Sequence, residues 1–172
     1  MKPPYVKKTV YLSLGSNIGD RAANLKQATE RLQDVGTVVA ASSLYETDPV
    51  EVEQQPMFLN CALAMETELT PWQFLSQILV LEQSMGRRRT QLKGPRTIDI
   101  DIVFFGDAVI DTSDLTVPHP AMHQRRFVLE PLAEIAPDAI HPVFKSYIRE
   151  LLSALPQDAG KVRRYEEPAA SS

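Results

Sequence analysis

Cysteine is nearly absent from this sequence: Cys61 is the one cysteine among 172 residues, so no disulfide can form within the chain. No apolar run approaches the roughly 18 residues that a membrane-spanning helix needs. The first residues, Met1 to Lys8, lack the apolar core of a secretion signal. Together these absences predict a reduced, cytoplasmic protein with no membrane partner.

A positive net charge is also missing. The chain has 18 Lys and Arg against 22 Asp and Glu, which gives a formal net charge of −4 at pH 7. Nucleic-acid-binding domains are usually basic, so we expect no nucleic-acid partner unless a local patch supplies the charge. The 44% of apolar residues and the length are typical of one globular domain. We expect a single domain over 1–172, with flexible tails at 1–8 and about 157–172.

Hydrophobic periodicity predicts a mixed fold. The clearest helix start is at Thr70, which can cap the helix, with Pro71 in the first turn and Gln73 completing a capping box. The order is β-α-β-β-α-β, which predicts an α+β fold of the ferredoxin-like type: an antiparallel sheet with helices packed on it, plus an additional hairpin. Strands are expected at 9–14, 37–47, 57–67 and 98–105, helices at 20–35, 70–86, 127–135 and 147–155, and a hairpin turn at 106–107 leading into 108–111.

Two carboxylates stand in the last predicted strand of the sheet. Asp99 and Asp101 are two residues apart, so their side chains share one face, about 6.6 Å apart at Cα. The alternating residues Ile98, Ile100, Ile102 and Phe104 are expected to face the core together. Like charges this close repel each other, and a divalent cation removes that cost. A solvated outer face of a sheet is the alternative interpretation of the pair.

A basic segment precedes this strand, and it contains Arg87, Arg88, Arg89, Lys93 and Arg96. Taken alone, such a run is often a solvated surface. Beside two carboxylates it has a chemical meaning, because Mg²⁺ binds carboxylate, phosphate and water oxygens while arginine matches phosphate geometry. The combination predicts a site for a phosphorylated ligand. The sequence has neither a Gly-rich phosphate loop with Lys-Ser/Thr nor the protein-kinase motifs.

Aromatic and amide side chains suggest a second subsite. Phe58 and Asn60 lie two apart on one face of a predicted strand, and Phe127 follows two arginines. A flat heteroaromatic ring could stack between two such rings while an amide binds its edge, although phenylalanines at these positions are more often core. Trp72, the single tryptophan, is placed on the second helix and is not expected to report on the site.

The residues alone leave three functions open. The first is an enzyme that handles a phosphorylated ligand with Mg²⁺. The second is a ferredoxin-like sheet that binds single-stranded nucleic acid, with 87–96 as its basic patch; the negative net charge argues against it. The third is a metal-dependent nuclease or phosphatase that uses the same two aspartates.

The segment 93–106, Lys-Gly-Pro-Arg-Thr-Ile-Asp-Ile-Asp-Ile-Val-Phe-Phe-Gly, resembles the signature of the 6-hydroxymethyl-7,8-dihydropterin pyrophosphokinase family. The Gly-Pro-Arg-Thr-Ile-Asp-Ile-Asp block is highly specific. The resemblance extends from about Val10 to Leu155, and its further matching motifs stand in the expected order at 14–17, 42–47, 58–60, 82–87 and 115–120.

The resemblance implies a single catalytic domain that transfers pyrophosphate from ATP to the hydroxymethyl group of a reduced pterin, with release of AMP, in folate biosynthesis. ATP is then a co-substrate, and Asp99 and Asp101 match the ligands of two Mg²⁺ ions. The implied partners are these small molecules, and a monomer is expected. The two mobile loops of the family correspond to 48–56 and 86–93, whose closure would exclude water.

The resemblance also implies roles for individual residues of this chain. The residues that match the catalytic set are Arg87, Arg96, Asp99 and Asp101. Those that match nucleotide contacts are Glu82, Arg87, Arg89, Arg96, Ile102, Thr116, His119 and Arg125. Those that match pterin contacts are Thr47, Asp48, Val50, Phe58, Asn60, Asp99 and Phe127.

Four positions depart from the pattern of some family members. Lys93 replaces a tryptophan that covers the active centre, and Thr90 replaces a lysine. Pro120 replaces an aromatic hydroxyl, and Asp114 stands where an arginine is sometimes found. The departures concern loop closure and the contacts with the nucleotide, and the two aspartates are unchanged.

Overall fold

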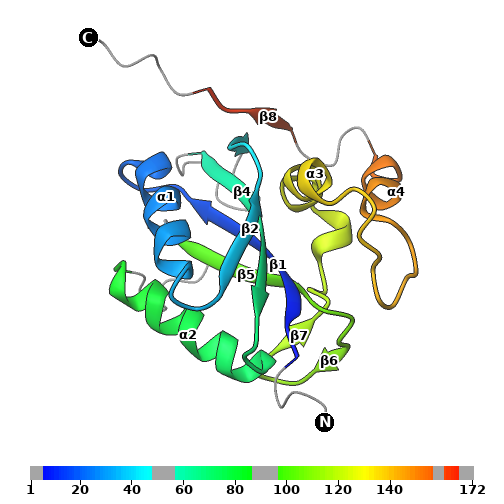
Figure 1. The fold of residues 1–172 in the computed structure, drawn as a ribbon. Coiled ribbons are helices and arrows are strands. Elements are labelled where there is room, and N and C mark those ends of the chain that lie inside the picture. The colour runs from blue at the N-terminus through cyan, green and yellow to red at the C-terminus, as the bar shows by residue number, and fades with distance from the viewer. Residues whose placement is uncertain (1–5, 48–56, 87–96, 157–160, 167–172) are drawn as a thin grey trace.

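The computed structural model describes residues 6–47, 57–86, 97–156 and 161–166. A six-stranded antiparallel sheet runs through the molecule in the order β5-β1-β4-β3-β8, with β2 also paired to β4 (Figure 1). The elements are β1 Lys8–Ser16, α1 Arg21–Leu32, β2 Thr37–Ala41, β3 Tyr45–Thr47, β4 Phe58–Thr67, α2 Pro71–Ser84, β5 Asp99–Phe105, β6 Ile110–Asp111, β7 Thr116–Val117, α3 Arg126–Ile135, α4 Ile148–Ser153 and β8 Val162–Arg164.

The strand order confirms the predicted α+β fold. In a β-α-β-β-α-β ferredoxin-like sheet, the first and third strands are central and the fourth lies outside the first. In this chain β1 and β4 are central, β5 lies beside β1, and β2 with β3 lies beside β4. No helix in the described ranges is long and apolar enough to cross a membrane.

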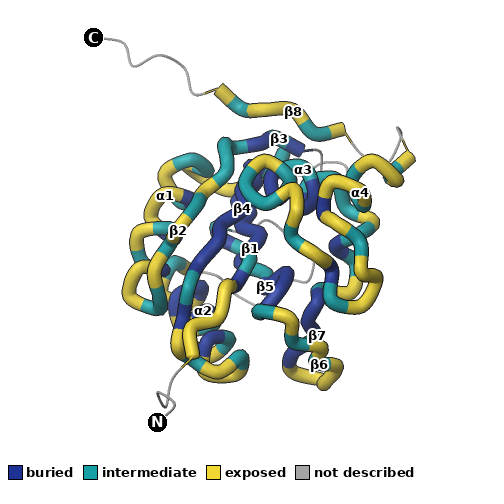
Figure 2. Tube along the Cα trace, turned by 45° about the vertical axis from the view of Figure 1, so that its right-hand side comes forward, coloured by how far each residue is buried: buried dark blue, intermediate teal, exposed yellow. Residues whose placement is uncertain are grey.

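Helices cover both faces of the sheet (Figure 1). On one face, α1 and α2 pack through Leu25, Phe74 and Ile78 against apolar side chains of β1, β4 and β5. On the other face, Leu129 and neighbouring residues of α3 pack with Ile148 of α4 on a smaller cluster. The central strands are therefore the most deeply buried part of the chain, as Figure 2 shows.

The predicted second strand, 37–47, is divided into β2 and β3, and both parts pair with β4. The interruption at 42–44 has a local cause. The Ser42 hydroxyl accepts a hydrogen bond from the Ala62 N–H at 2.8 Å, so a side chain replaces one bond of the backbone ladder. The chain turns there and resumes pairing at Tyr45, opposite Asn60.

A β-bulge changes the face that β5 presents. Leu12 pairs with Ile102 and Tyr11 pairs with Phe104, so Val103 is an extra residue in the ladder. Ile98, Ile100 and Ile102 face the α1–α2 side as predicted. Phe104 does not, because the bulge turns it to the α3 side, where it contacts a different cluster. The prediction that all four share one face was therefore wrong for Phe104.

The additional hairpin is present, but its strands differ from those predicted. Gly106 adopts a left-handed φ of 56°, which suits a turn after β5. The strand that follows, β6, pairs with β7 and not with β5. Thr112 closes this hairpin, since its backbone N–H and its hydroxyl both donate to the Leu115 carbonyl at 3.0 and 2.9 Å.

The stretch expected to be a flexible tail, 157–172, contains a strand. Val162–Arg164 forms β8 and pairs antiparallel with β3. The expectation of a tail was therefore wrong for these residues. Their sequence, Val-Arg-Arg, is too short and too charged to predict a strand from local propensity. The strand forms because β3 offers an exposed edge with which it can pair.

Candidate active site

The two aspartates and a buried amide meet across one glycine of β1. In antiparallel pairs, directly opposed residues point to the same side of the sheet. Gly15 is opposed by Asp99 on β5 and by Asn60 on β4. Ser13 is opposed by Asp101 on β5. The register therefore places the Asp99, Asp101 and Asn60 side chains on the α3 side of the sheet, opposite the isoleucines.

Gly15 makes this arrangement possible because it has no side chain. A Cβ atom at Gly15 would lie 2.8 Å from the Asn60 Nδ2 and 3.4 Å from the Phe58 ring. Contacts below 3.0 Å are essentially never made by real Cβ atoms, so no larger residue fits without displacing the amide. The Asn60 amide and the Phe58 ring therefore lie over β1, next to the strand that carries the aspartates.

Asn60 is held in one orientation by its neighbours. The Thr47 hydroxyl donates to Asn60 Oδ1 at 2.8 Å, and Asn60 Nδ2 lies 3.5 Å from the Leu14 carbonyl, to which it donates. Both side chains are buried, with 4% of each residue exposed. The structure thus brings together two of the residues predicted to bind the pterin.

The two predicted stacking rings are half-buried and lie on the α3 side of the sheet. Phe58 precedes Asn60 on β4, and Phe127 lies in the first turn of α3. The Arg125 guanidinium carbon is 5.6 Å from the centre of the Phe127 ring, a cation–π geometry. Half-burial leaves part of each ring accessible, unlike the phenylalanines of the core.

A cleft of about 580 Å³ opens beside Asp101. It lies between α2, the outer edge of β5 and the β6–β7 hairpin. Predicted site residues Asp101, Ile102, Thr116 and His119 all line it. Its other lining residues are Trp72, Leu75, Ser76, Ile78, Leu79, Ile100, Ser113, Asp114 and Leu115. The cleft therefore brings Ile102 of β5 together with Thr116 and His119, and α2 forms its other wall.

His119 is uncharged at neutral pH in this environment. Burial first, and then the nearby Arg125 charge, lower the pKa of its imidazole to about 4, while Asp99 opposes the shift. Its Nδ1 accepts a hydrogen bond from the Ala121 N–H at 3.2 Å, which leaves Nε2 to carry the proton. His119 can thus donate one hydrogen bond to a ligand without adding a charge.

Glu82 is buried within the fold, with 1% of its surface exposed. Its Oε2 accepts a hydrogen bond from the Ile100 N–H at 2.8 Å, which ties α2 to the outer edge of β5. It does not line the cleft described above, so its predicted nucleotide contact remains a prediction. The other predicted site residues, Arg87, Arg89, Arg96, Asp48 and Val50, lie outside the described residues.

Trp72 is the residue that sequence reasoning missed. It was expected to lie away from the site, yet it lines the same cleft as His119 and Thr116, and 46% of it is exposed. The signal was present in the helical spacing: Trp72, Leu75, Ser76 and Leu79 lie at intervals of three or four and share one face of α2.

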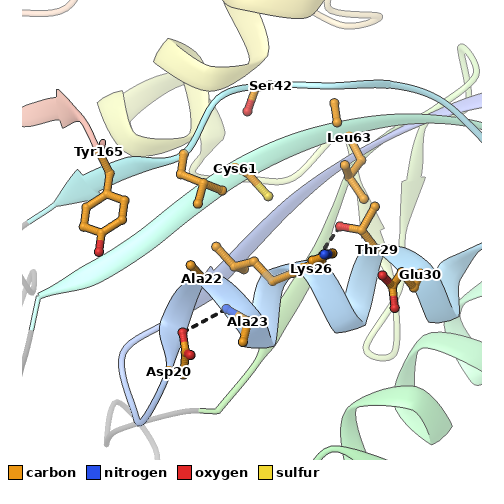
Figure 3. A pocket seen from close by; sticks show the side chains of 13 residues that line it. Asp20, Ala22, Ala23, Lys26, Thr29, Glu30, Ser42, Cys61, Leu63 and Tyr165 are labelled. Carbon is orange, nitrogen blue, oxygen red and sulfur yellow. Dashed lines mark hydrogen bonds between the residues drawn. The ribbon is translucent and has the colours of Figure 1, made fainter. Parts of the chain in front are cut away.

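A second hollow, of about 740 Å³, lies on the α1–α2 side of the sheet, between α1 and β4 (Figure 3). Lys26 and Glu30 of α1, Cys61 and Leu63 of β4, and Tyr165 line it among others. It contains none of the predicted site residues. Burial raises the pKa of the Cys61 thiol to about 12, so this thiol stays protonated and is a poor nucleophile.

The donor set suits a metal that is shared with a substrate. No group of three or more His, Cys, Asp or Glu side chains that could hold a metal occurs in the described part of the chain. Asp99 and Asp101 are both half-buried on one face of β5, and Asp101 lines the cleft, as does Asp114. Mg²⁺ commonly takes one or two carboxylates and completes its shell with water and phosphate oxygens.

The fold and the site first define a class: a ferredoxin-like α+β domain with paired carboxylates and a cleft at one edge of its sheet. A family model for 7,8-dihydro-6-hydroxymethylpterin-pyrophosphokinase matches residues 11–137. The chain belongs to this family of pyrophosphokinases, which confirms the resemblance in its motifs.

Individual relatives agree with the family match. The chain is 49% identical over 127 residues to the 2-amino-4-hydroxy-6-hydroxymethyldihydropteridine pyrophosphokinase of Bacillus subtilis, which covers 73% of this chain and 76% of the relative. It is 44% identical over 158 residues to the protein of the same description from Methylorubrum extorquens, with 91% and 98% covered.

Other relatives are much longer than this chain. It is 42% identical over 151 residues to the folic acid synthesis protein fol1 of Schizosaccharomyces pombe, and the match covers 87% of this chain but 21% of that protein. The chain thus spans about a fifth of that relative's length. A crystal structure of Plasmodium falciparum HPPK-DHPS with pteroate has a TM-score of 0.71 at 17% identity, covering 88% of this chain and 45% of that one. This likeness shows the fold.

We predict that His119 makes stability depend on pH. Its folded pKa of about 4 lies below its ordinary value of 6.5, so between these values the unfolded chain binds a proton that the folded chain does not. Stability is therefore lost as pH falls through this range. His119→Gln should flatten the curve of unfolding free energy against pH there, measured by urea titration in metal-free buffer. An unchanged slope between the two proteins would contradict the prediction.

Proposed function

We propose that this chain transfers the pyrophosphoryl group of ATP to the hydroxymethyl oxygen of 6-hydroxymethyl-7,8-dihydropterin, releasing AMP, as a step of folate biosynthesis. The observation that carries the proposal is the register of the central strands, in which Gly15 is opposed by Asp99 on one side and by Asn60 on the other. A carboxylate and a buried amide are thereby placed on the same face of the sheet, on the two strands that flank Gly15. One can bind a metal and phosphate, and the other can bind the edge of a heterocycle.

The pterin subsite consists of Asn60, Thr47, Phe58 and Phe127, with Asp48, Val50 and Asp99. The fixed orientation of the Asn60 amide supports its role, because an amide that cannot rotate distinguishes donors from acceptors on a ring edge. The half-buried rings of Phe58 and Phe127 offer apolar surface for stacking on the same side of the sheet.

The nucleotide subsite is the cleft between α2, β5 and the hairpin. Ile102, Thr116 and His119 line it, and Arg125 is near enough to affect the pKa of His119. Because β5 is the outer strand of the sheet, a base can bind to its outer backbone edge at groups other than the Ile100 N–H, which donates to Glu82, and the Val103 carbonyl, which accepts from the His119 N–H. Glu82, Arg87, Arg89 and Arg96 complete the proposed set of contacts.

Asp99 and Asp101 would hold two Mg²⁺ ions together with the triphosphate. The ions would supply charge neutralisation on the phosphate oxygens as the leaving group departs. The donor chemistry fits, since two carboxylates on one face leave the remaining coordination positions to phosphate and water oxygens.

The contribution of the chain to the reaction is positioning. The pterin oxygen forms a bond to the β-phosphorus, the bond from that phosphorus to the α–β bridging oxygen breaks, and the hydroxyl proton leaves to solvent. Asn60 and the two rings orient the oxygen, while Arg87 and Arg96 hold the phosphates in line with it. His119, uncharged at neutral pH, donates a hydrogen bond to the nucleotide. We propose that one chain carries the whole site, so that the protein acts as a monomer.

The proposal predicts AMP as the nucleotide product when ATP, Mg²⁺ and the pterin are mixed. Asp101→Asn keeps the shape of the side chain but removes its charge, so kcat should fall at least about a hundredfold, or roughly 3 kcal/mol. Asp107→Asn changes an exposed carboxylate in the turn after β5 and should leave kcat within about twofold. Formation of ADP or free phosphate in place of AMP, or wild-type turnover by Asp101→Asn, would reject the proposal.

Trp72 should report on nucleotide binding. It is the single tryptophan, and it lines the proposed nucleotide cleft. A non-hydrolysable ATP analogue should therefore change the intrinsic tryptophan fluorescence in a saturable way, and Trp72→Phe should abolish the signal with little loss of affinity by calorimetry. A titration that saturates by calorimetry without any fluorescence change would place the nucleotide elsewhere.

Gly15→Ala should damage the pterin subsite selectively. The new methyl group would lie 2.8 Å from the Asn60 Nδ2 and must displace the amide. We expect the KM for pterin to rise about tenfold or more, because overpacking a filled site costs on the order of 1–3 kcal/mol. Nucleotide affinity, followed by Trp72 fluorescence, serves as the control and should be unchanged. Equal losses for both ligands would show that the residue supports the fold alone.

A further inference from the structure

The C-terminal strand β8 completes the sheet beside the proposed pterin subsite. Val162–Arg164 pairs antiparallel with β3, so that Val162 opposes Thr47 and Arg164 opposes Tyr45. The strand lies outside residues 11–137, the segment that the family model matches. Figure 2 shows it beside β3, at the edge of the sheet. Its position gives it contact with the strand that carries Thr47.

One group of contacts joins β8 to α1 and to the outer face of β3. The Glu46 carboxylate accepts from Arg163 at 3.2 Å and from Arg21 at 2.8 Å. The Arg21 guanidinium also lies 5.5 Å from the centre of the Tyr165 ring. The Tyr165 N–H donates to the Leu44 carbonyl at 2.8 Å, which extends the pairing past the end of β8.

A second group of contacts is centred on Glu134 of α3. Its carboxylate accepts from the Tyr45 hydroxyl at 2.6 Å, the Ser43 N–H at 2.9 Å and Arg164 at 3.2 Å. Burial alone would raise the pKa of Glu134, but the hydrogen bonds from Tyr45 and Ser43 outweigh it and lower the pKa. The carboxylate is therefore ionised at neutral pH and ties α3, β3 and β8 together.

These contacts lead directly to the Asn60 amide. β3 has three residues, and its last residue, Thr47, donates the hydrogen bond that fixes Asn60 Oδ1. A strand this short with a free edge frays easily at its end. β8 covers that edge, and Val162 opposes Thr47 itself. The fixed position of the Thr47 hydroxyl therefore depends on β8, a strand from the far end of the chain.

We propose that β8 is a positioning element for the pterin: by holding β3, it keeps Thr47 bonded to Asn60 and so fixes the amide in the orientation that binds the ring. The inference rests on the proposed function, because it assigns a role to the same subsite. It predicts that loosening β8 weakens pterin binding while leaving nucleotide binding and the chemical step intact.

The test is a double variant in the full chain, Arg163→Ala with Arg164→Ala. Both side chains are more than half exposed, at 54% and 59%, so the variant should fold. We expect the KM for pterin to rise roughly threefold to tenfold, as the loss of two exposed ion pairs allows, with kcat and the KM for ATP within about twofold. A purely structural role would instead reduce the active fraction, and so kcat, at an unchanged pterin KM.

Two controls isolate the path through Thr47. Arg149 of α4 forms a comparable exposed ion pair with Asp138 at 2.9 Å. Arg149→Ala removes this pair and should change neither the KM for pterin nor the KM for ATP. Thr47→Val removes the hydroxyl that β8 is proposed to hold. In that background the double variant should produce no further rise in the pterin KM. A full additional rise would overturn the inference, as would a rise in the KM for ATP, which would indicate direct contact of the arginines with phosphate.

Amide hydrogen exchange separates this inference from the proposed function. The double variant should speed exchange at Thr47 and Asn60 relative to wild type, whether or not the chain turns over a pterin. Unchanged protection at both residues would overturn the positioning role. If the wild-type chain forms no AMP, the proposed function is rejected. Faster exchange in the variant would in that case still show that β8 keeps β3 in place.

Discussion

The register of three antiparallel strands around Gly15 is the constraint on which the site depends. Because the residues opposed to Gly15 are Asp99 and Asn60, the same ladder that buries the isoleucines of β5 also places a carboxylate and an amide on the other face. A slip of one residue would send the aspartates into the apolar core, where an unpaired charge is costly. The stability of the core therefore enforces the geometry of the site.

The two faces of the sheet have different roles: one forms the main apolar core, and the other carries the site residues. The α1–α2 face is a continuous apolar core. On the other face, α3 and α4 cover the part of β5 beyond the bulge, where Phe104 and Val103 join their cluster. The bulge thus marks the boundary between a covered apolar region and the region of Asp99 and Asp101. Glu82, although acidic, belongs to the core side, where its bond to the Ile100 N–H fixes the outer edge of β5.

Much of this could be predicted from local sequence. Paired aspartates in an alternating strand, and the capping box of Thr70 and Gln73, which the structure confirms, depend on neighbours close in the chain. The rest depends on distant partners. The bulge that moves Phe104 arises from the pairing of β5 with β1, the break at Ser42 arises from a bond to Ala62, and β8 forms because β3 has an open edge. Trp72 was missed because the second wall of its cleft, the β6–β7 hairpin, is more than thirty residues further along the chain.

Counting bound metal tests the central claim most directly, since the account requires the two aspartates to bind metal together with the nucleotide. Mn²⁺ can replace Mg²⁺ and can be counted by electron paramagnetic resonance in the presence of a non-hydrolysable ATP analogue and the pterin. The account predicts two Mn²⁺ ions per wild-type chain and at most one in Asp101→Asn, with the analogue still bound. Two ions in the variant, or none in the wild type at saturating analogue, would contradict it.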